Sequence, residues 1–418
     1  MVENVLRYLD CFKENYVMNK LLRKLNIYEA VLLVWTFVAS YYVTYKMTVA
    51  DGTVYHVSDY PAHIQSALSG TGYSLMEVIM KYLFMLTSDT KLIVFFISSL
   101  IALTGFAIRN LLELCLSKDT YRDGKSEIII TIAYSFIFLS SIYLPNRSPF
   151  YILRDGYNVP ISLESTHVIS FMTQPWHNST YMAMRLFGIM AIIYWIKIWN
   201  SESNIKNYVG LFLSLTFANL FKPNFIIAFA PTVFVYAILD LLINKKLNTI
   251  KKYLALAILF IVSMLPLLFQ YKVLYSSDDT SGISFTLKKV SELFKAGYLG
   301  WELLGTFTFP LIVAVIVLVN RKQDWILGLA WIFELITLIQ SLFMVETGTR
   351  LIHGNFTWNL YLASLALYTV CTAKLIDICD DSLKLKWVYK IAWGILFIHI
   401  VNSFMYFGLI LIGVGYDY

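Results

Sequence analysis

The sequence predicts an all-α, polytopic membrane protein, and three observations lead to that class. Apolar stretches near the bilayer length of about 20 residues recur along the whole chain. Hydrophobic residues make up 58% and charged residues only 14% of the 418 residues, whereas typical globular proteins have about 25% charged residues. Lysine and arginine occur in short clusters between the apolar stretches, which indicates membrane topology rather than a nucleic-acid-binding surface. We therefore expect a lipid bilayer and no nucleic acid as partner, and no separate soluble catalytic domain.

The apolar stretches predict about eleven transmembrane helices in a single domain, residues 1–418. Residues 1–26 precede the first of them as an amphipathic cytosolic segment with five basic residues. The predicted spans are 27–47, 92–116, 127–145, 179–199, 208–221, 224–243, 253–272, 301–319, 325–344, 357–375 and 387–412. The fifth is short, and Lys222-Pro223 separates it from the sixth, so this pair forms either two crossings or a re-entrant hairpin.

The distribution of basic residues predicts the orientation. One set of alternate loops holds 17 of the 33 lysine and arginine residues, although these loops are the shorter set. Basic loops stay on the cytosolic side. We therefore expect a multi-pass protein with a cytoplasmic N-terminus and an outer C-terminus, whose long outer loops are 48–91 and 146–178. Abundant Ile, Lys, Asn and Tyr favour a bacterial plasma membrane over the endoplasmic reticulum.

Histidine is unevenly distributed between the two predicted faces. Five of the six histidines fall in outer loops, and the inner loops contain none. The outer five are His56, His63, His167, His177 and His353, and only His399 lies in a span. Histidine is the side chain that titrates nearest neutral pH, so acid–base chemistry is expected on the outer face.

The first outer loop contains an acidic group beside the start of a predicted helix. In Asp59-Tyr60-Pro61-Ala62-His63 the proline suits the first helical turn. Asp59 would then be the N-cap, with His63 one turn further on. The pattern breaks at 69–72 and resumes over 73–86, which predicts two juxtamembrane helices. Helix capping alone explains an Asp at this position, but the same carboxylate can also act as a base. Asp51, before Gly52, suits an ordinary turn.

Further candidate residues lie in the later outer segments. Trp176-His177-Asn178 precedes a span, where Asn178 can cap the helix and the tryptophan has the interfacial aromatic belt as its simplest explanation. Lys222 lies alone between two apolar segments, where an ammonium either extends to water or meets a lipid phosphate. Arg154 lies in the second loop. The last outer loop holds Glu346, Arg350 and His353, and its acid and arginine can also form an internal ion pair.

Other polar groups give weaker indications. The four cysteines contain no Cys-x-x-Cys pair, which argues against a disulfide framework or zinc site. A divalent metal is possible through Asp51, Asp59 or His63, but no dedicated ligand set is evident, and no cofactor is certain. Glu334 lies in mid-span, where a buried acid needs a partner or a proton.

Taken together, these motifs resemble a known group of enzymes. A first outer loop with an Asp, followed by surface helices, on about a dozen spans is similar to the GT-C superfamily of membrane glycosyltransferases. The segments Asp59–His63, Trp176–Thr180, Lys222-Pro223 and Arg350–Phe356 also resemble bacterial multi-span proteins of surface-polysaccharide type. The architecture covers nearly the whole chain and the motifs only short parts of it. Some GT-C families have two adjacent acids in this loop, whereas Tyr60 follows Asp59 here.

The resemblance implies transfer of a sugar from a polyprenyl phosphate to an acceptor hydroxyl on a glycan or lipid-linked acceptor. Asp59 would be the base, with His63 or His177 orienting it or the substrate. Arg154, Lys222 and Arg350 would bind the donor phosphate. Asp51, Trp176, His177, Asn178 and His353 complete the expected substrate site, and a single displacement would invert C1. An O-antigen-type polymerase or ligase, and a polysaccharide or lipid transporter or flippase, stay open as alternatives.

Overall fold

The computed structural model describes most of the chain, and all structural statements below concern that part. The described residues are 26–49, 58–116, 126–140, 151–154, 157–160, 172, 174–200, 204–244, 250–275, 282–287, 290–291, 298–320, 324–347, 355–378 and 386–411.

The expected all-α polytopic class is confirmed. Within the described ranges, nine helices are long and apolar enough to cross a membrane. They are α3 (Ile27–Val49), α6 (Lys91–Cys115), α9 (Ser179–Trp199), α11 (Asn224–Asn244), α12 (Ile250–Tyr275), α14 (Tyr298–Val319), α15 (Trp325–Phe343), α16 (Trp358–Asp377) and α17 (Lys386–Leu411). Each corresponds to one predicted span.

The two remaining predicted spans are shorter helices. α8 (Ser126–Ser135) continues into the 3₁₀ turn η1 (Phe136–Phe138), and α10 (Ile205–Phe221) has 17 residues. α10 nevertheless returns along α9, because Lys222 at its C-terminus contacts Asn178 at the N-terminus of α9. α11 then runs to the opposite end, where Tyr236 meets Trp199. The segments 208–221 and 224–243 are therefore two traverses of the bundle and not a re-entrant hairpin.

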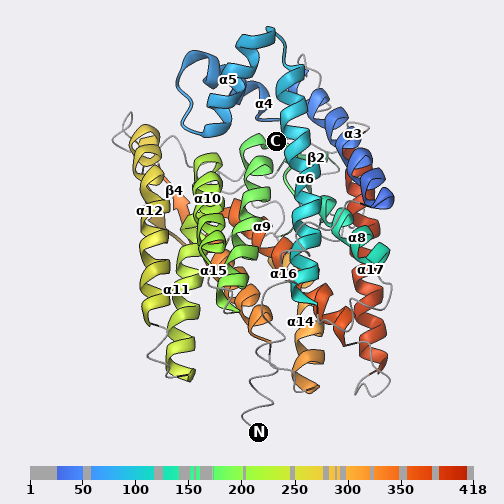
Figure 1. Ribbon diagram of the computed structural model, residues 1–418. Coiled ribbons are helices and arrows are strands. Elements are labelled where there is room, and N and C mark those ends of the chain that lie inside the picture. The colour runs from blue at the N-terminus through green and yellow to red at the C-terminus, as the bar shows by residue number, and fades with distance from the viewer. Residues whose placement is uncertain are drawn as a thin grey trace.

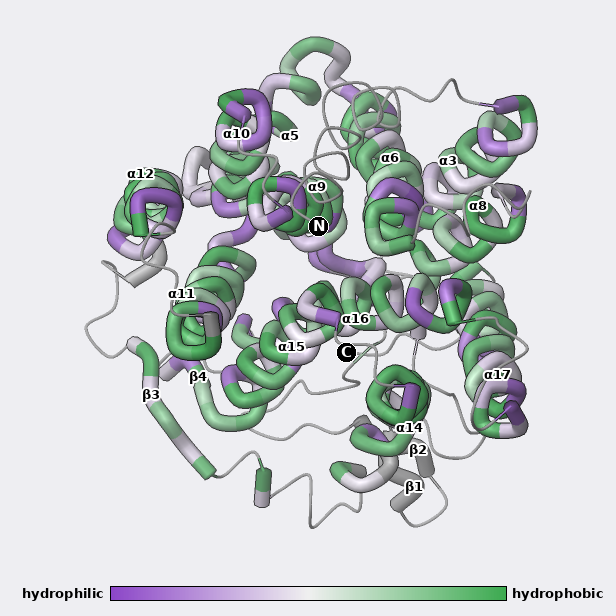
Figure 2. Tube along the Cα trace, turned by 60° about the horizontal axis from the view of Figure 1, so that its bottom comes forward, coloured by the Kyte–Doolittle hydropathy of each residue, from purple (hydrophilic) through white to green (hydrophobic). Residues whose placement is uncertain are grey.

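The helices form a bundle around α16 (Figures 1 and 2). α16 is almost entirely buried, whereas α11 and α12 at the periphery expose many apolar side chains. In a bilayer such side chains are about equally stable against lipid and against protein, so packing and hydrogen bonds, rather than the hydrophobic effect, hold the helices together. The polar residues of α16, among them Ser364 and Thr369, are buried inside the bundle.

Two short helices cover one end of the bundle, which we call the site end (Figure 1). α4 (Tyr60–Ser69) and α5 (Leu75–Thr87) lie where the first predicted loop has its two helical patterns. Gly70, with a positive φ, ends α4 in the left-handed cap conformation that suits glycine. Two small two-stranded antiparallel sheets also lie in the described part: β1 (Tyr151–Arg154) pairs with β2 (Tyr157–Pro160), and β3 (Ile283–Phe285) pairs with β4 (Met344–Glu346). A 3₁₀ turn, η4 (Asn355–Thr357), leads into α16.

Two polar groups within the spans have partners on neighbouring helices. Arg109 of α6 pairs with Glu29 of α3, and both side chains are almost completely buried. Glu334 of α15 accepts a hydrogen bond from Ser364 of α16 at 2.8 Å. The partner that Glu334 requires is therefore on the central helix.

Removal of one member of the Glu29–Arg109 pair should destabilise the bundle. We expect Arg109→Met to lower the free energy of unfolding by about 3–5 kcal/mol, because it leaves a buried carboxylate without its cation. The measurement is thermal unfolding in detergent. Lys91→Met, which removes an exposed cation from α6, serves as control and should change little; equal midpoints for both variants would contradict the role of the buried pair.

Candidate functional site

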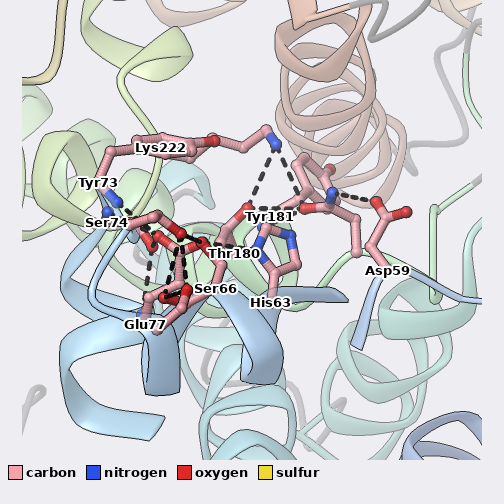
Figure 3. A network of polar contacts seen from close by, with 12 residues as sticks. Asp59, His63, Ser66, Tyr73, Ser74, Glu77, Thr180, Tyr181 and Lys222 are labelled. Atoms are coloured by element: carbon pink, nitrogen blue, oxygen red, sulfur yellow. Dashed lines mark hydrogen bonds and ion pairs between the residues drawn. The ribbon is translucent and has the colours of Figure 1, made fainter. Parts of the chain in front are cut away.

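Asp59 is held against the start of α9 by contacts with two consecutive residues. Its backbone N–H donates to the carbonyl of His177 at 3.1 Å. One of its carboxylate oxygens accepts a hydrogen bond from the Asn178 side-chain amide at 2.8 Å. Asp59 occupies the N-cap position of α4 but makes no side-chain cap hydrogen bond. The predicted N-cap position of Asp59 is therefore confirmed, but its carboxylate is turned towards α9 and does not cap α4 (Figure 3).

Asn178 joins Asp59 to a lysine from another helix. Its amide oxygen caps α9 by accepting from the Tyr181 backbone N–H at 2.9 Å, which confirms the predicted cap. The same oxygen accepts from the Thr180 hydroxyl at 2.8 Å and from Lys222 Nζ at 3.3 Å. Because the oxygen faces three donors, the amide nitrogen is the group that faces Asp59. The acid and the lysine thus share one amide.

Lys222 lies deep in the site, with only 2% of its surface exposed. Its ammonium contacts the hydroxyl of Thr180 at 3.3 Å and lies 4.5 Å from the centre of the Trp358 ring. The ring of His177 packs against the same tryptophan at 5.4 Å. A buried ammonium above an aromatic face is stabilised by the ring quadrupole. The lysine is therefore held inside the protein at the end of α10.

A second acid supports His63. His63 Nδ1 lies 3.0 Å from one oxygen of Glu77, which is almost fully buried in α5. The other Glu77 oxygen accepts from the backbone N–H groups of Tyr73 and Ser74 at 2.8 and 2.9 Å. Ser74 and Glu77 form a capping box. Gly72 leaves room for this arrangement, because a Cβ there would approach Glu77 Cβ to 2.8 Å.

The surroundings of Asp59 favour its ionised form. Burial acts to raise its pKa, but the charge of His177, the Asn178 hydrogen bond, and the charges of His63 and Lys222 together lower the pKa below the usual 3.8. Asp59 is therefore a carboxylate at neutral pH. Since its side chain is only partly buried, it combines access for a substrate with a fixed orientation.

The structure brings together five of the ten predicted site residues, although not all in the expected way. Asp59, His63, His177, Asn178 and Lys222 form one connected group of contacts. Trp176 is fully buried, stacked on Phe138 at 5.6 Å and packed on Phe407. Its ring is thus fully covered by protein, and its expected place in the substrate site stays a prediction. Four predicted residues or their side chains lie outside the described part of the chain: Asp51, the Arg154 side chain, Arg350 and His353.

Sequence reasoning missed Glu77 and Trp358. The pattern Ser74-x-x-Glu77 after a glycine is a capping-box pattern that could have placed the acid at the start of α5. It could not have indicated the contact with His63 on another helix. Trp358 and Trp176 both lie near the start of a span in the sequence. Only the packing shows that Trp358 is the one that lies beside Lys222. Glu346 accepts a hydrogen bond from the Asn355 amide at 2.6 Å, and Arg350, the partner considered for it, lies outside the described residues.

Comparison with known proteins gives no assignment for this site, so its chemistry has to be inferred from its own residues. The chain matches no known protein-family model, and no curated protein shows significant similarity to it. Among the described residues, no group of three or more His, Cys, Asp or Glu side chains is arranged to hold a metal ion. The arrangement offers an ionised acid, a buried ammonium, and a histidine held by a second acid.

The Glu77–His63 contact predicts a specific pH dependence of stability. Burial tends to raise the pKa of Glu77, but the His63 and Ser74 contacts outweigh it and lower the pKa below 4.5. A depressed folded-state pKa means that the stabilisation is present above pH 4.5 and is lost as the pH falls through the lower, folded-state value. We expect Glu77→Gln to lower the melting temperature at pH 7. Below pH 4.5 the melting temperature of the variant should fall less steeply with decreasing pH than that of the wild type, as measured by thermal unfolding in detergent. Parallel curves for variant and wild type would contradict the assignment.

Proposed function

We propose that the chain is a membrane glycosyltransferase that moves a sugar from a polyprenyl-phosphate donor to an acceptor hydroxyl. The observation that carries the proposal is the Asn178 amide that connects Asp59 and Lys222 at one end of a polytopic bundle. Such a transfer needs a base near the acceptor oxygen and a cation near the leaving phosphate, both at the depth of the lipid headgroups. The resemblance to the GT-C architecture supports the same class.

The proposed step is a single displacement at C1 of the sugar. The acceptor oxygen forms a bond to C1 while the bond between C1 and the phosphate oxygen breaks. Asp59 takes the proton of the acceptor hydroxyl, and the departing phosphate gains negative charge beside Lys222. His63, held by Glu77, would position the acceptor or Asp59. Attack opposite to the leaving group inverts the configuration at C1.

The cell-envelope setting is part of the proposal. The positive-inside pattern favours a cytoplasmic N-terminus and a site at the outer face of a bacterial plasma membrane, where a surface polysaccharide or a lipid-linked glycan would be the acceptor.

In the described spans, Arg109 and Glu334 are engaged by Glu29 and Ser364. This pairing favours a structural role for them over a transport pathway.

Asp59→Asn should abolish transfer while the protein stays folded. The amide oxygen can still accept from Asn178, but it cannot take a proton, so we expect a loss of about 10²–10⁴-fold in rate. The measurement is transfer of labelled sugar from a polyprenyl-phosphate donor in vesicles, with thermal unfolding to check integrity. Asp89→Asn, at an exposed acid of the same end, should keep normal activity. Wild-type turnover by the Asp59 variant would remove it as the base.

Lys222→Gln should weaken binding of the donor. Loss of one hydrogen bond from a charged group costs about 1.5–3 kcal/mol, or roughly ten- to hundredfold in affinity. Binding of undecaprenyl phosphate in nanodiscs measures the effect. Lys206→Gln, at the other end of α10, should bind normally, and Lys222→Arg should restore part of the affinity. Unchanged binding by Lys222→Gln would contradict the phosphate role.

A further inference from the structure

α11 and α12 lie next to each other in the bundle (Figures 1 and 2), and we call the line between them the α11–α12 seam. Two cavities are lined by residues of both helices. A small cavity of about 60 Å³ lies at the site end and is lined by Asn224 and Ile227 of α11 and by Leu267 and Gln270 of α12. A larger cavity of about 440 Å³ lies further along the same two helices. Its lining runs from Ala230 to Leu241 on α11 and from Ile250 to Met264 on α12.

The small cavity adjoins the candidate site. Its lining includes Pro223, which follows Lys222, and Tyr73, which precedes the Ser74–Glu77 capping box. Polar groups from Gln270, Glu346 and Asn355 also line it. The head of a molecule bound beside Lys222 would therefore lie next to the end of the seam.

The two cavities are separated by less than one helical turn. On α11 the last residue of the small cavity is Ile227 and the first of the large one is Ala230; on α12 the corresponding residues are Leu267 and Met264. Residues three apart lie on the same face of a helix. Pro231 lies at this junction and cannot donate to the Ile227 carbonyl, which is instead satisfied by the Gln340 side chain from α15 at 3.1 Å. The two cavities are thus aligned end to end on the same faces of α11 and α12, and we call this aligned pair the track.

The large cavity is suited to an apolar chain. Its lining consists of aliphatic and aromatic side chains, and among them Trp195 and Tyr253 carry polar groups, an indole N–H and a hydroxyl. Several lining residues, including Phe234, Leu254 and Ile261, are exposed on the outside of the bundle. The cavity lies within two membrane-spanning segments. It is therefore open to the hydrocarbon of the bilayer, and lipid chains are what surround it.

The length of the track selects among lipids. At about 1.5 Å per residue, the stretch from Asn224 to Leu241 spans about 25 Å. The hydrocarbon core of a bilayer is about 30 Å thick, so an ordinary phospholipid tail anchored at one face reaches only about 15 Å. A lipid with its head at the site end and its tail at Leu241 must have a much longer chain.

We propose that the α11–α12 seam binds the hydrocarbon chain of a long polyprenyl phosphate whose head lies beside Lys222. The inference rests on the proposed function for the identity of the head, and it adds a selection for chain length. Within a bilayer the groove gains little from the hydrophobic effect, since the chain leaves one apolar environment for another. Shape fit in the track therefore provides the selection.

Ala257→Trp tests the proposal by filling the large cavity. Ala257 lines the cavity, whereas Ala255, two positions away on the same helix, does not; Ala255→Trp is the matched control. The probes are undecaprenyl phosphate and the short-chain farnesyl phosphate, and binding is measured in nanodiscs. We expect Ala257→Trp to weaken binding of undecaprenyl phosphate by about five- to tenfold, the scale of packing interactions in membranes. Farnesyl phosphate, too short to reach Ala257, should bind as before, and Ala255→Trp should leave both affinities unchanged.

The outcomes separate this inference from the proposed function. Equal affinity of wild type and Ala257→Trp for undecaprenyl phosphate, or an equal loss for both probes, overturns the seam as a chain-binding track. The seam is also overturned as a chain-binding track if the wild type carries bound phospholipid that Ala257→Trp loses, while both bind undecaprenyl phosphate equally. If Lys222→Gln keeps both affinities while Ala257→Trp weakens only the long probe, the seam stands and the phosphate role of Lys222 in the proposed function fails.

Discussion

The amide of Asn178 can satisfy its neighbours in only one orientation, and the candidate site depends on that orientation. Its oxygen accepts hydrogen bonds from the Tyr181 backbone N–H, the Thr180 hydroxyl and the Lys222 ammonium, so its nitrogen is the group that donates to Asp59. A carboxylate and an ammonium removed from water are costly unless each is hydrogen-bonded. Asn178 forms a hydrogen bond with each of the two charged groups and lies between them, so they do not form a direct ion pair. The acid and the cation consequently stay apart, on two sides of a small polar centre.

The same logic explains how α4 and α5 are attached to the bundle. Asp59 at the start of α4 binds the start of α9 through its backbone and side chain. Glu77 in α5 then fixes His63 of α4, so the two surface helices hold each other. The short helices would be marginal alone, since isolated helices below about 12–15 residues are barely stable in water. Their contacts with α9 and with each other supply the order that local propensity does not.

Local patterns in the sequence were enough to predict the helices but not the contacts between them. Long apolar windows identify spans because lipid demands length and low polarity, and Pro61 and the Gly70 region mark the limits of α4 for reasons internal to the segment. The partner of Glu334, Ser364, lies 30 positions away, and the partner of Asp59 lies 119 positions away. Trp176 and Trp358 look alike as interfacial tryptophans, yet one is sealed between Phe138 and Phe407 and the other lies beside Lys222. Only three-dimensional packing separates such cases, and it also revealed that Glu77 serves His63 as well as its own helix.

The separation of 119 positions between Asp59 and Asn178 has a consequence for how the protein is made. A ribosome delivers the chain from its N-terminus, so α3, α4, α5, α6 and α8 are synthesised before the segment that completes the site exists. Lys222 arrives later still, after α10. The contacts of Asn178 with Asp59 and Lys222 can therefore form only after α9 and α10 have both been made, and Trp358 joins Lys222 only after α16 begins.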